Sequence, residues 1–110
     1  MSYEHKQLAA GRWDQLSSLE QMANIGSEVE RALNWQIKNN PTYCQRASVR
    51  ALELTDLALE HATTFPRRKE LARLRESLVD YFFCGNEFKS TAASWRKYFY
   101  HFTYAARKNY

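Results

Sequence analysis

Apolar residues recur every three or four positions along four stretches of the chain, which is the spacing of one face of an α-helix. The stretches run from Trp13 to Ile37, from Pro41 or Thr42 to His61, from Pro66 to about Phe83, and from Thr91 to Arg107. Short segments rich in Asn, Gly, Pro or Thr separate them. This pattern predicts an all-α fold, an antiparallel four-helix bundle, in a single domain that covers residues 1–110. Residues 2–12 form either a short extra N-terminal helix or a frayed end.

Turn-forming residues mark the ends of these predicted helices. The asparagines before Pro41 suit the left-handed position that ends a helix, and Gly85 is expected to take the same position after the third helix. Asp14 is a candidate first-turn acid or N-terminal cap of the first helix. Asn40 or Thr42 is a candidate cap of the second helix, and Thr64 of the third. Gly26 lies inside the first helix, where glycine costs about 1 kcal/mol relative to alanine. We therefore expect another helix to cross closely at Gly26.

The third and fourth predicted helices supply a large part of the expected core. Arg75 lies beside the apolar stripe of the third helix, so it is the best candidate for a partly buried ion pair. Glu76 and Asp80 are expected to point outward into solvent. The side chains expected to be buried and in mutual reach are Leu74, Leu78, Phe82, Trp95, Phe99 and Phe102.

The last predicted helix has two chemically different faces. Trp95, Phe99, Phe102 and Ala106 share one stripe at 100° per residue, which is the core side. The opposite side, named here the basic tyrosine face, consists of Arg96, Lys97, Tyr100, Tyr104 and Arg107. Tyrosines beside cations can stack the bases of single-stranded nucleic acid, and they are also enriched at protein interfaces. A third interpretation is that residues 2–12 fold over this face and cover both rings.

The second predicted helix is apolar on two sides. One stripe contains small residues such as Ala47 and Ala51, and a second stripe contains Val49, Leu52 and Leu59. Such a helix is either central in its bundle or shared with a second subunit. We expect the second stripe, with Asp56 beside it, to form a homodimer interface. The Asp56 carboxylate then needs Arg46, Arg50 or a cation of the other subunit as its partner. The alternative is that Asp56 is an edge carboxylate that reaches solvent or an arginine.

Composition and charge narrow the class of protein. The chain has a formal net charge of +4, and the basic residues are concentrated after residue 64. That half can attract phosphates or an acidic protein surface. Cys44 and Cys84 are distant in the sequence and fit two reduced thiols. Neither a signal peptide nor a membrane-spanning run is present, so we expect a cytoplasmic protein that does not enter the membrane.

Motifs for chemistry are largely missing from the sequence. Glu-x-x-His pairs, zinc-type clusters of Cys and His, and glycine-rich phosphate loops do not occur. We therefore expect no cofactor, no metal and no catalytic residue. One exception is Arg96-Lys-Tyr-Phe-Tyr-His101, which resembles the Arg-x4-His motif of HEPN-type ribonucleases. This resemblance implies that Arg96 stabilises a phosphate and His101 acts as a general acid or base in a dimeric cleft. Lys97 departs from the small polar or acidic residue usual at that position.

A second resemblance covers most of the chain. It is to a group of small prokaryotic helical proteins of uncharacterised function, and it implies the bundle without any activity. The segments that carry it are ANIGSEVERALNW at 23–35, RALELTDLAL at 50–59, LVDYFF at 78–83, and GNEFKST at 85–91 followed by Trp95, Tyr98 and Phe99.

The function that these observations favour is that of a non-enzymatic helical-bundle protein that acts by binding, as a homodimer and with a protein partner. The alternative is a HEPN-like ribonuclease of the toxin type, or an RNA-binding relative that uses the basic tyrosine face.

Overall fold

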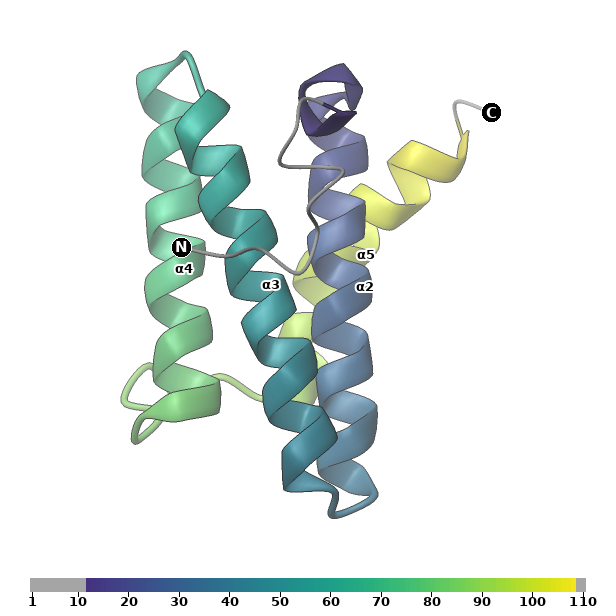
Figure 1. Cartoon of the computed structure of the whole chain (residues 1–110), viewed down its shortest axis with the longest axis vertical. Helices are drawn as coiled ribbons and strands as arrows, with labels where there is room; N and C mark the ends of the chain where they lie inside the picture. The colour runs from purple at the N-terminus through teal and green to yellow at the C-terminus, as the bar shows by residue number, and fades with distance from the viewer. Residues whose placement is uncertain (1–11, 109–110) are drawn as a thin grey trace.

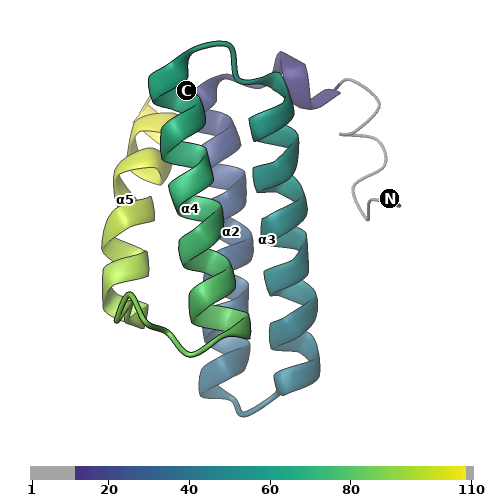
Figure 2. The same cartoon turned by 90° about the vertical axis from the view of Figure 1, so that its left-hand side faces the viewer.

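The computed structural model of the chain describes residues 12–108. A four-residue 3-10 helix, η1 (Arg12–Gln15), precedes four α-helices: α2 (Ser18–Ile37), α3 (Pro41–His61), α4 (Phe65–Phe83) and α5 (Ala92–Lys108). Successive α-helices run in opposite directions (Figure 1, Figure 2). Residues 12–108 contain no strand. The predicted all-α antiparallel four-helix bundle is confirmed, whereas most of the proposed extra N-terminal helix falls in residues 2–11, outside the described part.

Helices α2 and α3 form the centre of this arrangement. Helix α2 packs against α3 and α5, and α3 also packs against α4, whereas the backbones of α4 and α5 have little contact. Aromatic side chains join the last two helices, since the ring centroids of Tyr81 and Trp95 are 6.1 Å apart. One buried cluster collects side chains from η1 and all four α-helices, among them Trp13, Leu54 and Leu71. Within residues 12–108, every helix is too short or too polar to cross a membrane.

The first α-helix begins later than the sequence pattern predicts. Glu20 N–H donates to Ser17 Oγ at 3.1 Å, and Ser17 N–H donates to Glu20 Oε1 at 3.0 Å. This capping box satisfies two backbone donors and fixes the helix start at Ser18. The prediction of one helix from Trp13, with Asp14 near its start, is therefore wrong. Trp13 belongs to η1 and is fully buried. It is apolar because it fills the core, and not because it continues the periodicity of α2.

The other helix ends follow the expected turn chemistry, with one exception. Asn40 caps α3 and Thr64 caps α4, each by accepting a backbone N–H from three residues later. Asn39 takes the left-handed conformation after α2 (φ 56°), as predicted. After α4, however, Asn86 takes that conformation (φ 53°) in place of Gly85. Asn86 tolerates this conformation because its side-chain amide exchanges two hydrogen bonds with the Ser90 backbone across the loop.

Asp80 is buried, contrary to the prediction that it points into solvent. Its side chain accepts the backbone N–H of Glu87 at 2.8 Å and that of Phe88 at 3.0 Å. These charge-assisted bonds compensate the burial of the carboxylate and hold the α4–α5 loop against the end of α4. The pattern of α4 alone could not indicate this, because the loop that covers Asp80 comes later in the chain. Glu76 is exposed, as predicted.

Helix α5 crosses α2 at Gly26. A Cβ atom added to Gly26 would lie 2.8 Å from Phe99 Cδ1 and 3.0 Å from Phe99 Cβ, which is closer than atoms pack. Trp95 stacks on Phe99, with ring centroids 6.1 Å apart and planes inclined by 21°. The predicted close crossing at Gly26 is confirmed.

The predicted core is confirmed in its central members. Leu74, Leu78, Trp95 and Phe99 are buried, and Phe82 and Phe102 pack against them while partly exposed.

We predict that Phe99→Ala lowers the free energy of unfolding by about 3 to 5 kcal/mol, because it removes a large ring from a packed crossing. Urea denaturation followed by circular dichroism measures this loss. The adjacent Tyr100→Ala is the matched control, since the Tyr100 side chain is 64% exposed and its truncation should cost below about 0.5 kcal/mol. A loss below about 1 kcal/mol for Phe99→Ala would contradict the packing described here.

Candidate functional site

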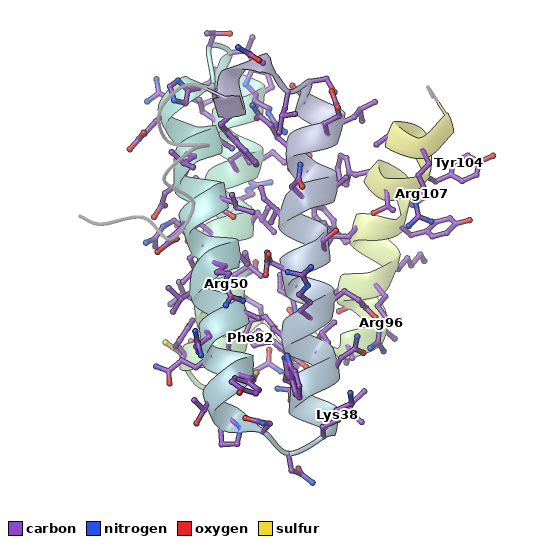
Figure 3. All side chains as sticks on the ribbon, turned by 45° about the vertical axis from the view of Figure 1, so that its right-hand side comes forward. Lys38, Arg50, Phe82, Arg96, Tyr104 and Arg107 are labelled. Carbon is purple, nitrogen blue, oxygen red and sulfur yellow. The ribbon has the colours of Figure 1, made fainter. Side chains whose placement is uncertain are left out.

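The exposed side of α5 carries two stacked tyrosines. The ring centroids of Tyr100 and Tyr104 are 6.0 Å apart and their planes are inclined by only 23°. The two residues are 64% and 56% exposed, and Lys97 and Arg107 beside them are also exposed. Figure 3 shows Tyr104 and Arg107 projecting from α5 away from α3 and α4. Burial of the opposite face through Trp95 and Phe99 produces this exposure, as the helical spacing predicts.

The basic tyrosine face includes one cation that is already paired within the chain. The Arg96 guanidinium Nε donates to both carboxylate oxygens of Glu30 on α2, at 3.0 and 3.1 Å. Its Nη2 donates to Asn34 Oδ1 at 3.4 Å. The pair is close to half exposed, so it contributes about 0 to 1 kcal/mol to stability. Glu30 therefore reduces the positive charge of this face at Arg96, whereas Lys97 and Arg107 keep theirs exposed to solvent.

An open groove of about 280 Å³ runs between α2 and α5 beside this face. Its buried lining includes Val29, Leu33 and Phe99, and its exposed lining includes Arg96 and Tyr100. The groove thus joins an apolar floor to the edge of the basic tyrosine face. The segment 2–12, proposed as an alternative cover for the two tyrosines, lies outside the described residues except for Arg12.

The two residues of the ribonuclease-like motif have different surroundings. Arg96 is held by Glu30 and Asn34, whereas His101 is exposed and its ring lies 6.3 Å from that of Tyr100. Among residues 12–108, no three His, Cys, Asp or Glu side chains lie close enough together to hold a metal ion. A catalytic role for Arg96 and His101 stays a prediction.

The proposed dimer stripe of α3 is only partly free. Val49 is 37% exposed, but Leu52 and Leu59 pack against the bundle's own core while partly exposed. The reason is that α3 packs between α2 and α4. Two apolar stripes are also typical of a helix in such a central position. The expected contiguous apolar patch on α3 alone is therefore reduced to Val49.

Asp56 finds its partner within the chain. Arg75 Nε of α4 donates to Asp56 Oδ1 at 2.6 Å, with the Arg75 side chain 44% exposed and that of Asp56 23% exposed. This confirms the predicted ion pair of Arg75. It also confirms the alternative that Asp56 reaches an arginine. The expectation that Asp56 needs Arg46, Arg50 or a second subunit is wrong, because α4 supplies Arg75, nineteen positions further along the chain.

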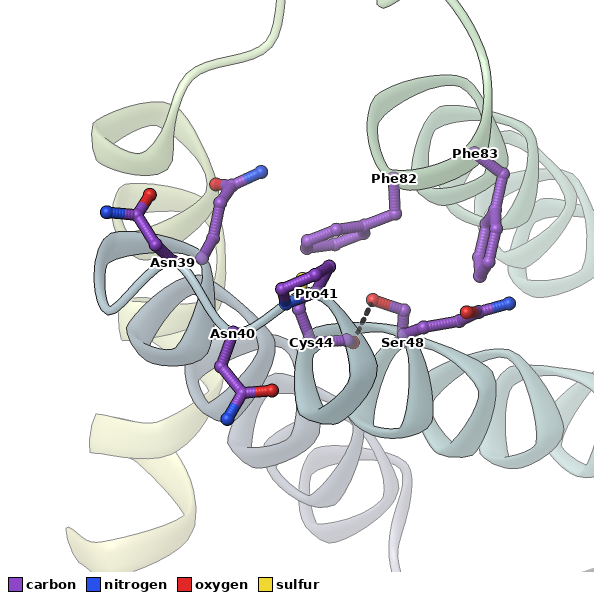
Figure 4. A pocket seen from close by; sticks show the side chains of 9 residues that line it. Asn39, Asn40, Pro41, Cys44, Ser48, Phe82 and Phe83 are labelled. Atoms are coloured by element: carbon purple, nitrogen blue, oxygen red, sulfur yellow. Dashed lines mark hydrogen bonds between the residues drawn. The ribbon is translucent and has the colours of Figure 1, made fainter.

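A larger groove lies at the end of the bundle where α2 turns into α3. Its volume is about 610 Å³, and Figure 4 shows Phe82 and Phe83 of α4 facing Pro41, Cys44 and Ser48 of α3. We name it the amide groove. Its lining residues are Gln36, Asn39, Asn40, Pro41, Cys44, Gln45, Ser48, Phe82 and Phe83.

Sequence reasoning did not find the amide groove. Asn39, Asn40 and Pro41 were interpreted only as the end of one helix and the start of the next, and Phe82 only as a core residue. A usable signal was present, since Gln45 and Ser48 lie three positions apart on α3 and so share a face with Pro41. The contribution of α4 could not be inferred, because it depends on which end of α4 reaches the turn.

Comparisons with known proteins give no relatives: no family model, curated protein or solved structure matches the chain. The resemblances to HEPN-type ribonucleases and to small prokaryotic helical proteins therefore stay predictions.

One phenol of α5 has surroundings that raise its pKa. Tyr98 lies on the side of α5 that faces α4, where it lines a groove with Glu70, Arg73 and Leu74. The pKa of Tyr98 is raised from 10 to about 12, mainly by burial and also by the Glu70 carboxylate, while Arg67 partly opposes the rise. The folded chain thus favours the neutral phenol.

This shift predicts a loss of stability in alkali. Unfolded Tyr98 loses its proton near pH 10, whereas the folded phenol keeps its proton to about pH 12, so stability falls as the pH rises between these values. We expect the free energy of unfolding to decrease less in Tyr98→Phe than in the wild type between about pH 9 and about pH 11. Tyr104→Phe, at an exposed phenol, serves as the control. Equal decreases in the wild type and Tyr98→Phe would contradict the assignment.

Proposed function

We propose that this chain is a non-enzymatic interaction protein that binds an acidic surface of a partner protein through the basic tyrosine face of α5. The observation that carries the proposal is the stacked, exposed pair Tyr100 and Tyr104 with the exposed cations Lys97 and Arg107 beside it. The face is presented by a helix whose other side is packed into the core.

The loss of side-chain entropy on binding is small for such a surface. Tyrosine offers a large contact area with few rotatable bonds, and the stacking of Tyr100 on Tyr104 already restricts both rings. Little side-chain entropy is therefore lost when a partner covers them. Lys97 and Arg107 at the edge would accelerate association with an acidic partner and set its orientation.

Glu30 is what favours a protein partner over RNA. Glu30 and Tyr100 both line the α2–α5 groove, and the Glu30 carboxylate neutralises the cation that a phosphate would otherwise meet at Arg96. Nucleic-acid binding depends mainly on accumulated positive charge, so this carboxylate weakens it. The HEPN-like alternative additionally requires Arg96 to leave Glu30 and a second subunit to complete the cleft.

Two further parts belong to the proposal. The chain acts as a homodimer, for which exposed apolar residues such as Val49 and Phe83 provide the driving force. It works in the cytoplasm, which suits its free thiols Cys44 and Cys84.

The test compares three forms of the protein as affinity baits in native cell extract. We expect Tyr100→Ala/Tyr104→Ala to lose a partner that the wild type captures, and the purified partner to bind the double variant at least about tenfold more weakly, as tyrosine hot spots do. Tyr43→Ala is the matched control, since Tyr43 is also exposed but lies on α3. The affinity of the wild type should fall as salt is added.

Other outcomes would decide against this proposal. A partner that binds the double variant and the wild type equally would remove the basic tyrosine face from the function. Binding of single-stranded RNA by the pure protein, lost in the double variant, would favour the RNA-binding alternative. Cleavage of RNA that disappears in both Arg96→Ala and His101→Ala would establish the ribonuclease alternative.

A further inference from the structure

The amide groove differs from the rest of the surface in its chemistry. None of its lining residues is charged, although 25% of the chain consists of charged residues. Four of them are carboxamides, namely Gln36, Asn39, Asn40 and Gln45. The cores of protein interfaces are depleted of charged residues in the same way.

Exposed apolar side chains continue the groove along α3 and α4. Phe83 lines the groove and is 41% exposed, and Phe82 beside it is partly exposed. Val49, 37% exposed, follows the lining residue Ser48 and lies one helical turn beyond Gln45. The lining residues and these two side chains are themselves uncharged, and they come from α2, α3, α4 and the α2–α3 turn.

Several amides of the groove have unused hydrogen-bonding capacity. Within residues 12–108, the Asn39 and Gln45 side chains form no hydrogen bond, and both residues are exposed. Toward the same described residues, Gln36 uses only its Oε1, which accepts the Tyr81 hydroxyl at 3.0 Å. A carboxamide carries both donors and acceptors, so it can pair with an identical carboxamide.

A second copy of this chain is the occupant that fits such a surface. Two chains of net charge +4 repel each other wherever like charges meet, and contact between two basic tyrosine faces would oppose Lys97 and Arg107 to their own copies. The amide groove brings no charge to the contact. Across a two-fold axis the same patch meets itself, which carboxamides allow and ammonium or guanidinium groups oppose.

We propose that the amide groove, together with Val49 and Phe83, is the contact surface of a homodimer. This inference rests on the homodimer part of the proposed function and locates it. Val49 of the predicted interface is kept. Leu52, Asp56 and Leu59 are removed from it, because they contact other residues of the same bundle. Residues of the α2–α3 turn and of the end of α4 take their place.

Sedimentation velocity of the full chain, from micromolar to hundreds of micromolar concentrations, tests the inference. Gln45→Lys adds a like charge from each chain to the contact and should raise the dimer dissociation constant at least about tenfold. Gln15→Lys is the matched control, because it makes the same substitution at an exposed glutamine of η1 and should leave the constant within about twofold. An equimolar mixture of Gln45→Lys and Gln45→Glu should recover a dimer, because the charges are then opposite. Circular dichroism verifies that each variant keeps its helices.

The possible failures are distinguishable. A wild type that is monomeric at every concentration would overturn both this inference and the homodimer part of the proposed function, while partner binding by α5 would stand. A dimer that Gln45→Lys does not weaken would overturn only the location. In that case, loss of the dimer in Tyr100→Ala/Tyr104→Ala would assign self-association to α5.

Discussion

The contact between Gly26 and Phe99 determines where the last helix lies. Helix α5 has little backbone contact with α4, so its position depends mainly on α2, and it meets α2 where the missing Cβ admits the Phe99 ring. Phe99 and Trp95, stacked on one another, then turn the same side of α5 into the core. Because a helix has opposite faces, this packing directs Tyr100 and Tyr104 to solvent.

Two surfaces of the bundle differ in the partners they suit. The outer side of α5 combines exposed phenols with the cations Lys97 and Arg107, which attract an acidic surface and repel a copy of themselves. The amide groove, at the turn between α2 and α3, is uncharged and edged by Phe83. A chain that is dimeric through the groove would present two α5 faces, so a partner with repeated acidic sites would bind with avidity.

Local chemistry made the helices predictable, whereas long-range contacts limited what could be inferred about the sites. The caps Asn40 and Thr64 act on donors three residues away, so their roles followed from the sequence. The prediction for Asp80 was wrong because the N–H groups that donate to its carboxylate belong to the α4–α5 loop. That loop comes close to Asp80 only in the folded chain. Likewise, the outward side of α5 followed from helical spacing, but the pairing of Arg96 with Glu30 joins residues 66 positions apart. No helical pattern contains that information.

A double-mutant cycle between positions 26 and 99 tests the central contact most directly. In the wild type, Gly26→Ala should lower the free energy of unfolding by about 1 to 3 kcal/mol despite the better helix propensity of alanine, because the added methyl overpacks the crossing. In a Phe99→Ala background the same substitution should be neutral or stabilising by up to about 1 kcal/mol, since only the helix propensity remains. An equal effect of Gly26→Ala in both backgrounds would mean that the two residues do not touch. The position of α5 would then have another cause.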